Sequence, residues 1–372
     1  MKSERIDSEN SSNDLPTGNK KEIDFTPLFF PKTMAVIGAS KNPVGALKYV
    51  RAHKDTPIKV FPVNINPELD ELEGLKVHRS VEEIGQEIDL AIIGVPKQHV
   101  PAVIRGFKDT VVKFAVIFTS GFSESGNDDL QVSLEEAIAS VPTRFIGPNC
   151  LGIYNPRARL VYFPGYPCDE TDGNIAFISQ SGGHTAKTNT YLMSHGANFS
   201  RTISIGNCID LKPPDFLPYF KQDPDTCVIG FYLESTSDGR ALMKSLRDVT
   251  REKPVIIWKG GRGKVGVQAT ASHTGKLAGN YKMWEVMCKQ TGTMLASDFD
   301  VFAGLLTMFS FNIPVPVSNR VALVACGGGN AVEAADFFET KGFKIPELGE
   351  ETKKKIYKFI PDVNTSLRNP VD

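Results

Sequence analysis

The sequence predicts an α/β protein made of consecutive domains, each built on a doubly wound parallel sheet. Three observations point to this fold class. Short runs of β-branched and apolar residues recur from Met34 onward, each run ends in Gly, Ser, Asn or Pro, and each is followed by a segment with helical periodicity. The length of 372 residues, at roughly 150 residues per domain, accommodates two to three such domains.

The first block of the chain contains five predicted strands separated by four predicted helices. The strands are expected at residues 34–37, 59–63, 90–93, 115–118 and 144–146. The helices are expected near residues 45–52, 81–86, 100–107 and 128–138. This alternation predicts a five-stranded, doubly wound domain, to which we assign residues 25–156.

A bridge containing Gly, Pro and Asp at residues 164–173 separates this block from a second series of the same kind. The second series has strands expected at residues 175–178, 201–205, 228–233, 255–258 and 293–295. Its helices are expected near residues 185–194, 215–220, 240–248, 281–290 and 299–309. We assign residues 172–312 to this second domain, which repeats the architecture of the first.

A third series begins after a linker at residues 313–319 and contains a strand expected at 321–325 and a helix expected near 332–340. About 50 residues form a poor independent core. We therefore interpret residues 320–372 as the start of a third, truncated α/β domain.

Composition and charge argue against several classes of partner. The 42 Lys and Arg residues oppose 43 Asp and Glu residues, the formal net charge is −1, and no long basic run is present. Nucleic acid is therefore not an expected partner. The six cysteines include no CxxC pair and no Cys/His cluster at metal spacing, so neither a disulfide framework nor a metal site is expected.

Neither a targeting segment nor a membrane span is expected. Residues 1–24 are polar and lack an apolar segment, so they are predicted to form a disordered tail and not a signal peptide. The uncharged stretch at 301–319 contains Ser310, Pro314 and Pro316, which favours a buried helix and a connector over a membrane span. A cytoplasmic protein without a membrane partner is expected.

A glycine-bearing turn follows the first predicted strand. Gly38, Ala39 and Ser40 connect this strand to a helix, and the N–H groups at such a turn suit a phosphate or pyrophosphate. A dinucleotide site would need GxGxxG and an acidic residue at the end of the second strand, which here ends in Asn64. An NAD-dependent dehydrogenase is therefore disfavoured, whereas another phosphate-bearing nucleotide ligand and a helix start without a ligand both stay open.

Further polar or glycine-bearing segments follow other strands of the first domain. Ligands of open α/β sheets bind beyond the carboxyl ends of the strands, so these segments should line one crevice together with the Gly38 turn. They contain Val95, Pro96, Ser120, Gly121 and Asn149. Cys150 follows directly, and with no histidine near it in sequence it is interpreted as a small buried apolar residue.

The second domain contains a similar turn. Ser181, Gly182 and Gly183 follow a predicted strand and open a helix, which again offers unpaired N–H groups to an anion.

A histidine in this domain has neighbours suited to chemistry. His273 stands among Ser, Thr and Gly residues in a segment with nearby cations, and His184 is the rival because it follows the 181–183 turn. Glu234 ends a predicted strand, where a carboxylate could orient an imidazole or simply pair with a local cation. The other four histidines are predicted to be solvated; they are His53, His78, His99 and His195.

Taken in order, these segments resemble the α part of the ADP-forming (NDP-forming) acyl-CoA synthetases, which are related to the succinyl-CoA synthetase α subunit. The likeness extends over residues 25–372. The matching segments are VIGAS at 36–40, GF at 121–122 followed by Glu124, GPNCLGIYNP at 147–156, ISQSGG at 178–183, GN at 206–207, YLES at 232–235, KPVIIWKGGRG at 253–263, ASHTGKLAG at 271–279, CGGGNAVEAAD at 326–336 and NPVD at 369–372.

The resemblance implies a Rossmann-like CoA-binding domain followed by flavodoxin-like CoA-ligase domains with parallel sheets. It implies that His273 becomes phosphorylated and that Glu234 holds it. Ser181, Gly182 and Gly183 would form the phosphate cradle. The residues implied to border coenzyme A are Gly38, Ala39, Ser40, Val95, Pro96, Ser120, Gly121 and Asn149.

The activity implied is the reversible conversion of acyl-CoA, ADP and phosphate to a carboxylic acid, CoA and ATP, through an acyl phosphate and a phosphohistidine. ATP or ADP and Mg²⁺ would bind an ATP-grasp domain or β subunit that is not visible in these residues, and an oligomer is expected. The chain has Gly183, His184 and Thr185 where the family commonly has Ala-Leu-Gly, and Cys326 where Asn is usual, which leaves the acyl substrate open. A non-catalytic CoA-binding regulatory module and an acyl-CoA-forming lyase variant are the alternatives.

Overall fold

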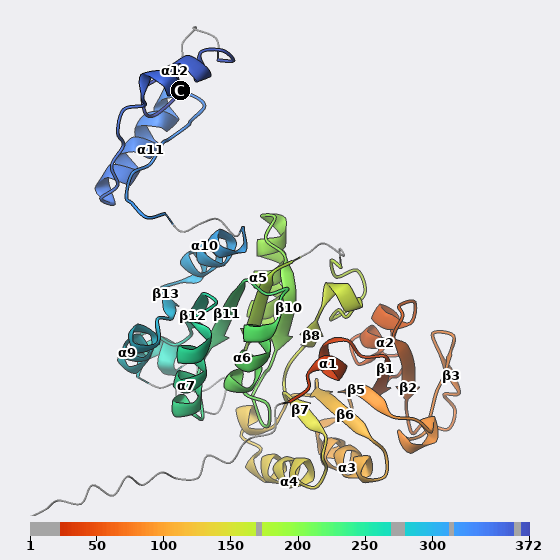
Figure 1. Cartoon of the computed structure of the whole chain (residues 1–372). Helices are drawn as coiled ribbons and strands as arrows, with labels where there is room; N and C mark the ends of the chain where they lie inside the picture. Colours follow the sequence, from red (N-terminus) through yellow and green to blue (C-terminus); the bar gives the residue numbers. More distant parts are fainter. Residues whose placement is uncertain (1–22, 169–172, 269–279, 312–315, 361–365) are drawn as a thin grey trace, which may run out of the picture. The chain divides into compact units, whose positions relative to one another are not determined.

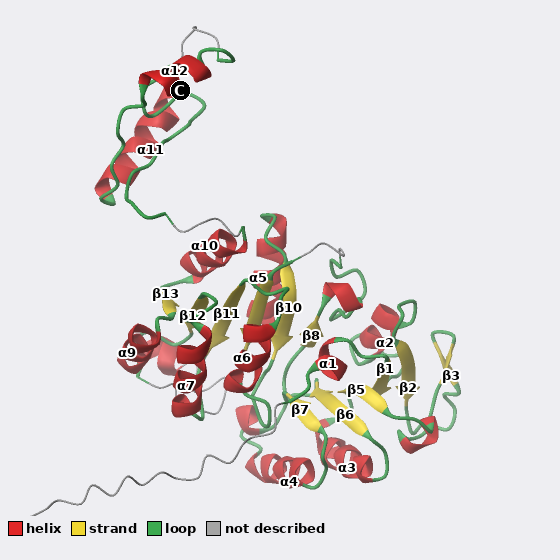
Figure 2. Cartoon of the chain, in the orientation of Figure 1, coloured by secondary structure: helices red, strands yellow, loops and turns green. Residues whose placement is uncertain are grey.

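The computed structural model of the chain describes residues 23–168, 173–268, 280–311, 316–360 and 366–372 (Figure 1). The chain divides into two compact units, residues 1–312 and residues 313–372. The described residues of the first unit contain two large sheets, with helices on both sides of their strands, and one two-stranded hairpin (Figure 2).

The first sheet is five-stranded and entirely parallel, with the strand order β2-β1-β5-β6-β7. Both faces of its strands are apolar because helices cover both sides. Met34 and Val36 point into one core cluster, and Ala35 and Ile37 point into another. The strands are β1 (Thr33–Ile37), β2 (Lys59–Val63), β5 (Ile88–Ile93), β6 (Val112–Ile117) and β7 (Arg144–Ile146).

The helices of this first domain are short. They are α2 (Leu47–His53), α3 (Val100–Arg105) and α4 (Asp128–Ala139), with single 3-10 turns η1 (Glu82–Ile84), η2 (Lys97–His99), η3 (Gly106–Lys108) and η4 (Ser123–Ser125). The prediction of a helix at 81–86 was wrong. Only one turn forms there, because Gly85 takes up the left-handed conformation (φ +69°) and ends it.

The second sheet is six-stranded, in the order β13-β12-β11-β9-β10-β8. Five strands are parallel, and β8 pairs with β10 in the antiparallel sense. Since β8 follows β7 directly, the chain passes from one sheet into the other at this point. The strands are β8 (Gly152–Tyr154), β9 (Ile175–Ser179), β10 (Phe199–Ser204), β11 (Val228–Leu233), β12 (Val255–Lys259) and β13 (Met294–Ala296).

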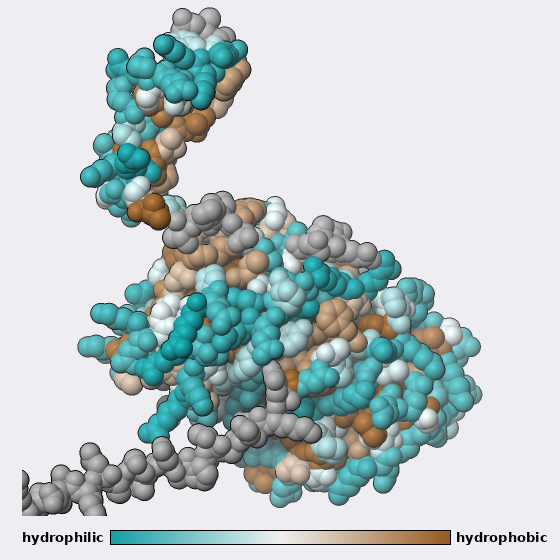
Figure 3. All heavy atoms as spheres, in the orientation of Figure 1, coloured by the Kyte–Doolittle hydropathy of each residue, from teal (hydrophilic) through white to brown (hydrophobic). Residues whose placement is uncertain are grey.

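Most helices of the second sheet begin at a side-chain cap. Ser181, Asp238 and Asp298 each accept a hydrogen bond from an N–H of the first turn, as N-cap residues do. Helices α6 and α7 present charged and polar side chains outward, seen as teal in Figure 3. The helices are α5 (Gly182–Ser194), α6 (Pro213–Gln222), α7 (Gly239–Val249), α9 (Tyr281–Thr291) and α10 (Phe299–Ser310).

A continuous apolar core joins the two sheets. It includes Val36 and Ile92 of the first sheet and Ile178 and Phe231 of the second. Three short elements that the sequence analysis did not predict contribute to this arrangement or flank it: α1 (Thr26–Phe29), the β3 (Glu71–Leu72) and β4 (Leu75–Lys76) hairpin, and β8. Each large side chain buried here contributes about 1.5–3 kcal/mol. The shared core keeps the carboxyl edge of the first sheet against the start of α5.

His53 is fully buried, so the prediction that it is solvated was wrong. Its Nδ1 donates to the carbonyl of Tyr49 at 2.7 Å, and its Nε2 accepts the N–H of Val161 at 3.1 Å. Burial lowers the pKa of His53 to about 4, an effect that the hydrogen bond to Tyr49 partly offsets. Local sequence patterns do not reveal the hydrogen bond from Val161 to His53, because the two residues are far apart in the sequence.

The second unit contains α11 (Gly328–Thr340) and α12 (Glu350–Ile356). The strand expected at 321–325 is not formed. Arg320 and Val324 make only isolated bridges, to Lys344 and Val371. Little apolar surface is buried in this unit, and among its described apolar residues only Leu323, Ala331, Leu367 and Val371 are buried.

None of the described helices combines the length and apolarity needed to cross a membrane. No disulfide links the six cysteines, all of which lie in the described part of the chain.

Candidate active site

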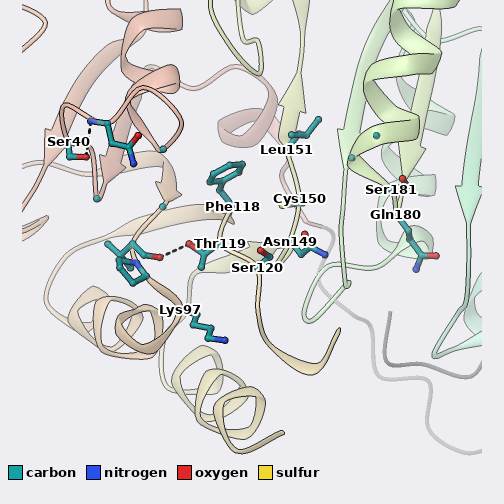
Figure 4. Close-up of a pocket in the computed structure, with 18 residues that line it drawn as sticks. Ser40, Lys97, Phe118, Thr119, Ser120, Asn149, Cys150, Leu151, Gln180 and Ser181 are labelled. Atoms are coloured by element: carbon teal, nitrogen blue, oxygen red, sulfur yellow. Dashed lines mark hydrogen bonds between the residues drawn. The ribbon is translucent and has the colours of Figure 1, made fainter. Parts of the chain in front are cut away.

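A cavity of about 760 Å³ opens where the carboxyl edge of the first sheet faces the start of α5 (Figure 4). It is lined by strand-end segments of the first sheet and by the turn after β9. Nine of the residues singled out from the sequence line it together: Gly38, Ser40, Val95, Pro96, Ser120, Asn149, Ser181, Gly182 and Gly183. The two turns that were predicted separately to suit phosphate groups therefore share one space.

The turn after β1 approaches its neighbouring strand end closely. Gly38 has φ +85°, and a Cβ there would lie 2.9 Å from the backbone carbon and oxygen of Gly94 and from Cγ1 of Val95. Only glycine fits this position without displacing the next strand end. The backbone at Gly38 and Ser40 is thereby open to the cavity.

Two of the residues predicted to border CoA do not line the cavity. Ala39 is fully buried, and its carbonyl accepts a hydrogen bond from Asn64 Nδ2 at 2.7 Å. Gly121, with φ +106°, leaves room for the aliphatic part of Lys97, because a Cβ there would lie 2.7 Å from Lys97 Cδ. Both residues support lining residues and do not border the space themselves.

The Gly121 loop is held by Glu124. Its Oε1 accepts the N–H of Gly121 at 2.5 Å, and its Oε2 accepts the N–H of Phe122 at 3.2 Å. Asn207, from the second sheet's side, donates to Oε2 at 2.7 Å. This carboxylate thus connects the loop after β6 to the segment that follows β10 of the second sheet.

Lys97 was missed by the sequence analysis. Among the described residues that line the cavity it is the only charged one, and its side chain projects from the turn that follows Val95 and Pro96 (Figure 4). A cation at this edge suits an anionic ligand. Its position directly after a strand-end Val-Pro pair was a usable signal.

The start of α5 forms the opposite wall. Ser181 is the N-cap, and its Oγ accepts the N–H of His184 at 3.3 Å. Gly182 and Gly183 form the first turn, where backbone N–H groups lack helical acceptors and the helix dipole favours negative charge. A phosphate bound to these N–H groups would lie in the cavity, because Gly182 and Gly183 line it.

Glu234 lies just beyond the end of β11 and is only 6% exposed. Its backbone N–H donates to Gln180 Oε1 at 2.6 Å, and its carboxylate Oε1 accepts from the Tyr232 hydroxyl at 3.2 Å. Gln180 lines the cavity and directly precedes Ser181. The predicted carboxylate is therefore connected to the predicted phosphate cradle through one side chain, although it does not line the cavity.

His184 packs within an aromatic cluster. Its ring centroid lies 4.4 Å from that of Tyr232 and 4.6 Å from that of Trp258. Burial and the nearby Lys187 lower the pKa of His184, which favours the neutral imidazole. Although it follows Gly183, this histidine is not among the residues that line the cavity.

Lys259, at the end of β12, is a second residue that the sequence analysis did not select. It is 3% exposed, its Nζ donates to the carbonyl of Gly260, and it lies 5.5 Å from the Trp284 ring centroid. Burial lowers the pKa of Lys259 to about 8, with the charge of Glu234 acting in the opposite direction. His273 lies outside the described residues.

Cys150 lines the cavity but is buried, and burial raises the pKa of its thiol. A protonated thiol is a poor nucleophile, in agreement with the interpretation of Cys150 as an apolar residue.

A second cavity of about 570 Å³ shares Gly38, Ser40, Val95 and Pro96 with the first. Apolar residues such as Val81, Val103 and Phe107 line it. The guanidinium of Arg79, at its rim, is already occupied by backbone carbonyls of residues 64–69 and by Asp70. The shared residues make the two cavities neighbours along the carboxyl edge of the first sheet.

Comparisons with known proteins match both domains. A family model of a CoA binding domain matches residues 32–156, and one of a succinyl-CoA ligase like flavodoxin domain matches residues 172–309. The chain is 37% identical over 348 residues to the α subunit of the ADP-forming acetate–CoA ligase II of Pyrococcus furiosus, covering 92% of this chain and 75% of that one. It is 35% identical over 356 residues to the ADP-forming acetate–CoA ligase of Methanocaldococcus jannaschii, covering 95% of this chain and 49% of that one.

A solved structure is similar over most of the chain. The dinucleotide-forming acetyl-coenzyme A synthetase 1 of Candidatus Korarchaeum cryptofilum, in complex with phosphate and ADP, superposes with a TM-score of 0.82 at 36% identity. The match covers 94% of this chain and 75% of that one. This chain thus spans three quarters of one α-subunit relative and about half of a longer relative.

Proposed function

This chain belongs to the ADP-forming acyl-CoA synthetase family of ligases, and from that premise we propose that it carries the CoA-binding and phosphohistidine half of such an enzyme. The proposed reaction is the reversible conversion of acyl-CoA, phosphate and ADP to a carboxylic acid, CoA and ATP. The observation that carries the proposal is the single cavity in which the Gly38 turn and the 181–183 turn face each other.

CoA would lie along the carboxyl edge of the first sheet. The apolar second cavity suits its adenine, and the Gly38 turn, with Lys97 nearby, suits its pyrophosphate. The pantetheine arm would then run through the larger cavity towards Gly182 and Gly183. This arrangement brings the thioester to the phosphate cradle.

The first chemical step is attack of bound phosphate on the acyl carbon. A C–O bond forms, the C–S bond breaks, and CoA leaves as a thiolate that takes up the proton from phosphate. Backbone N–H groups at the start of α5 hold the phosphate oxygens, so the nucleophile is oriented without reorganisation.

The second step transfers the phosphoryl group to His273. Its neutral imidazole attacks phosphorus, a P–N bond forms, and the P–O bond to the acyl group breaks to release the carboxylate. Glu234 accepts the N–H of the other ring nitrogen, which fixes the tautomer and offsets the positive charge that develops on the ring. The role of His273 in this scheme rests on the family resemblance.

An ATP-grasp domain or a β subunit is the proposed partner, since one relative is named an α subunit and another is a longer chain. That partner would bind ADP with Mg²⁺ and receive the phosphoryl group. A small carboxylic acid or its CoA thioester is the proposed substrate, and a cytoplasmic, oligomeric assembly is the expected setting.

The proposal is tested with an acyl phosphate labelled on phosphorus. The wild-type chain should acquire acid-labile, base-stable label, and ADP with Mg²⁺ should discharge it as ATP only when the ATP-grasp partner is added. His273→Asn should abolish the label, whereas His184→Asn should keep it and change the preference among acyl groups. Label retained in His273→Asn would overturn the assignment, and a chain that binds CoA but takes up no label would be a non-catalytic module.

A further inference from the structure

Tyr232, in β11, and Glu234, just beyond the end of that strand, are two positions apart, so their side chains lie on the same side of the chain. The hydroxyl donates to Oε1 of Glu234 at 3.2 Å. Tyr232 is 7% exposed and Glu234 is 6% exposed, so water has little access to this contact. A hydrogen bond to a charged acceptor in such a place has a larger effect than one at the surface.

The Tyr232 ring is held from two sides. Its centroid lies 4.4 Å from that of His184 and 4.8 Å from that of Trp258, and Trp258 is its register partner on β12. Gly260 provides the space for the hydroxyl, because a Cβ at this position would lie 2.6 Å from the Tyr232 oxygen and 3.3 Å from Glu234 Cγ. The hydroxyl therefore has a defined place beside the carboxylate.

The Tyr232 hydroxyl stays protonated. Burial, reinforced by the charge of Glu234, raises the pKa of Tyr232, so its hydroxyl remains a donor wherever Glu234 is ionised. The charges of Lys259 and Glu234 also act on each other, and Lys259 lies at the end of the neighbouring strand β12. The backbone of Glu234 is fixed independently, by Gln180 Oε1 at 2.6 Å.

From these contacts we infer that Tyr232 is a positioning residue for Glu234: its hydroxyl holds Oε1 and so fixes the orientation of the carboxylate. The inference rests on the proposed role of Glu234 in the phosphohistidine reaction. His184 and Trp258 act one step further away, by fixing the tyrosine ring.

The decisive variant is Tyr232→Phe, which keeps the ring and removes only the hydroxyl. In the complex with the ATP-grasp partner, the rate of His273 labelling from acyl phosphate should fall about tenfold to a hundredfold. The affinity for CoA should not change, because Tyr232 does not line the cavity. The acidic limb of the rate profile should move to higher pH, since the carboxylate loses a donor that favours its charged form.

Two further variants separate positioning from a structural effect. Glu234→Gln should slow labelling by itself, and adding Tyr232→Phe to it should cause no further loss, because the tyrosine acts through the carboxylate. Gly260→Ala should reproduce the Tyr232→Phe effect even if the latter folds poorly, since the added methyl displaces the hydroxyl. Tyr162→Phe is the matched control, because Tyr162 is also a buried tyrosine, packed against Tyr154 and Tyr166. The complex that carries this substitution should acquire label at the wild-type rate.

A Tyr232→Phe complex that labels at the wild-type rate would overturn the inference and leave the proposed function standing. If Tyr232→Phe slows labelling as much in the Glu234→Gln variant as in the wild type, Tyr232 acts independently of the carboxylate, which would also overturn the inference. Absence of label from the wild-type complex would instead overturn the proposed function, and this inference with it.

Discussion

Gln180 and Glu234 are joined across the ends of two adjacent strands, with Oε1 of Gln180 accepting the N–H of Glu234 at 2.6 Å. The same oxygen accepts the N–H of Ser235 at 3.1 Å, and Nε2 of Gln180 donates to the Ser235 carbonyl at 3.1 Å. Because Gln180 is followed by Ser181 of the proposed phosphate cradle, one side chain sets the spacing between that turn and the carboxylate.

Replacing Gln180 with Leu should therefore uncouple these two parts of the site. The variant leaves the buried N–H groups of Glu234 and Ser235 without their acceptor, at a cost of about 1–3 kcal/mol in stability. Labelling of His273 from acyl phosphate should slow at least tenfold, while CoA binding to the first domain should stay within about twofold of wild type. Rapid-quench labelling and calorimetry would measure the two effects, and equal losses in both would contradict a local coupling.

The turn after β1 is predicted to be essential for CoA. Gly38→Val places a side chain 2.9 Å from the Gly94 backbone at φ +85°, so the turn must move and CoA affinity should fall by about tenfold or more. The control is Gly74→Val, which has a similar φ of +81° but no atom within 4 Å of the added Cβ. Calorimetry should show normal CoA affinity for the control. Normal affinity in a folded Gly38→Val protein would locate the CoA site elsewhere.

Lys97 should contribute charge to CoA binding. Lys97→Met keeps the aliphatic part over Gly121 and removes the cation, and the dissociation constant for CoA should rise about tenfold at low ionic strength. The difference from wild type should shrink as salt is added, because screening weakens the interaction that the variant lacks. Lys108→Met, on a residue that does not line either cavity, should bind CoA as wild type does. A loss that is independent of salt would argue against a charge effect.

His53 should make the first unit sensitive to acid. Its pKa is about 4 in the fold, below its ordinary value of 6.5, so the unfolded chain binds the proton more tightly. The contribution of the neutral His53 to the free energy of unfolding is therefore fully present above pH 6.5. It is lost as the pH falls towards 4, which lowers the free energy of unfolding by about 3 kcal/mol. Urea unfolding at several pH values would measure this, with His53→Gln expected to be less stable at pH 7 and less dependent on pH. An unchanged dependence in the variant would assign the acid sensitivity to other groups, and His99→Gln, at an exposed position, is the control.

Much of the fold follows from local patterns, and the exceptions have specific physical causes. All ten expected strands of the two sheets are present, because continuous apolar runs with turn residues at their ends reflect strands buried on both faces. The three-residue strand β8 was missed because its identity depends on pairing with β10, some fifty positions later. His53 was misjudged for the same reason, since its partner Val161 is distant in sequence.

In the candidate site, too, some residues could be predicted from local sequence patterns and others could not. The residues at strand ends could be gathered into one cavity from topology alone, because parallel strands end at a common edge. Gln180 was not selected because a glutamine beside a turn carries no pattern of its own, and Lys97 was not selected although it directly follows the strand-end pair Val95-Pro96. Their importance depends on what lies across from them, namely Gly121 and Glu234.

The conversion of a thioester into a phosphohistidine, proposed for this cavity, is tested most directly by starting from acyl-CoA. The wild-type complex, incubated with acetyl-CoA and phosphorus-labelled phosphate in the absence of ADP, should release free CoA and acquire an equal amount of label on His273. Both products should be lost together in a variant that carries Gly38→Val, and the label alone should be lost in His273→Asn. Release of CoA by the wild type without label on His273 would contradict the account.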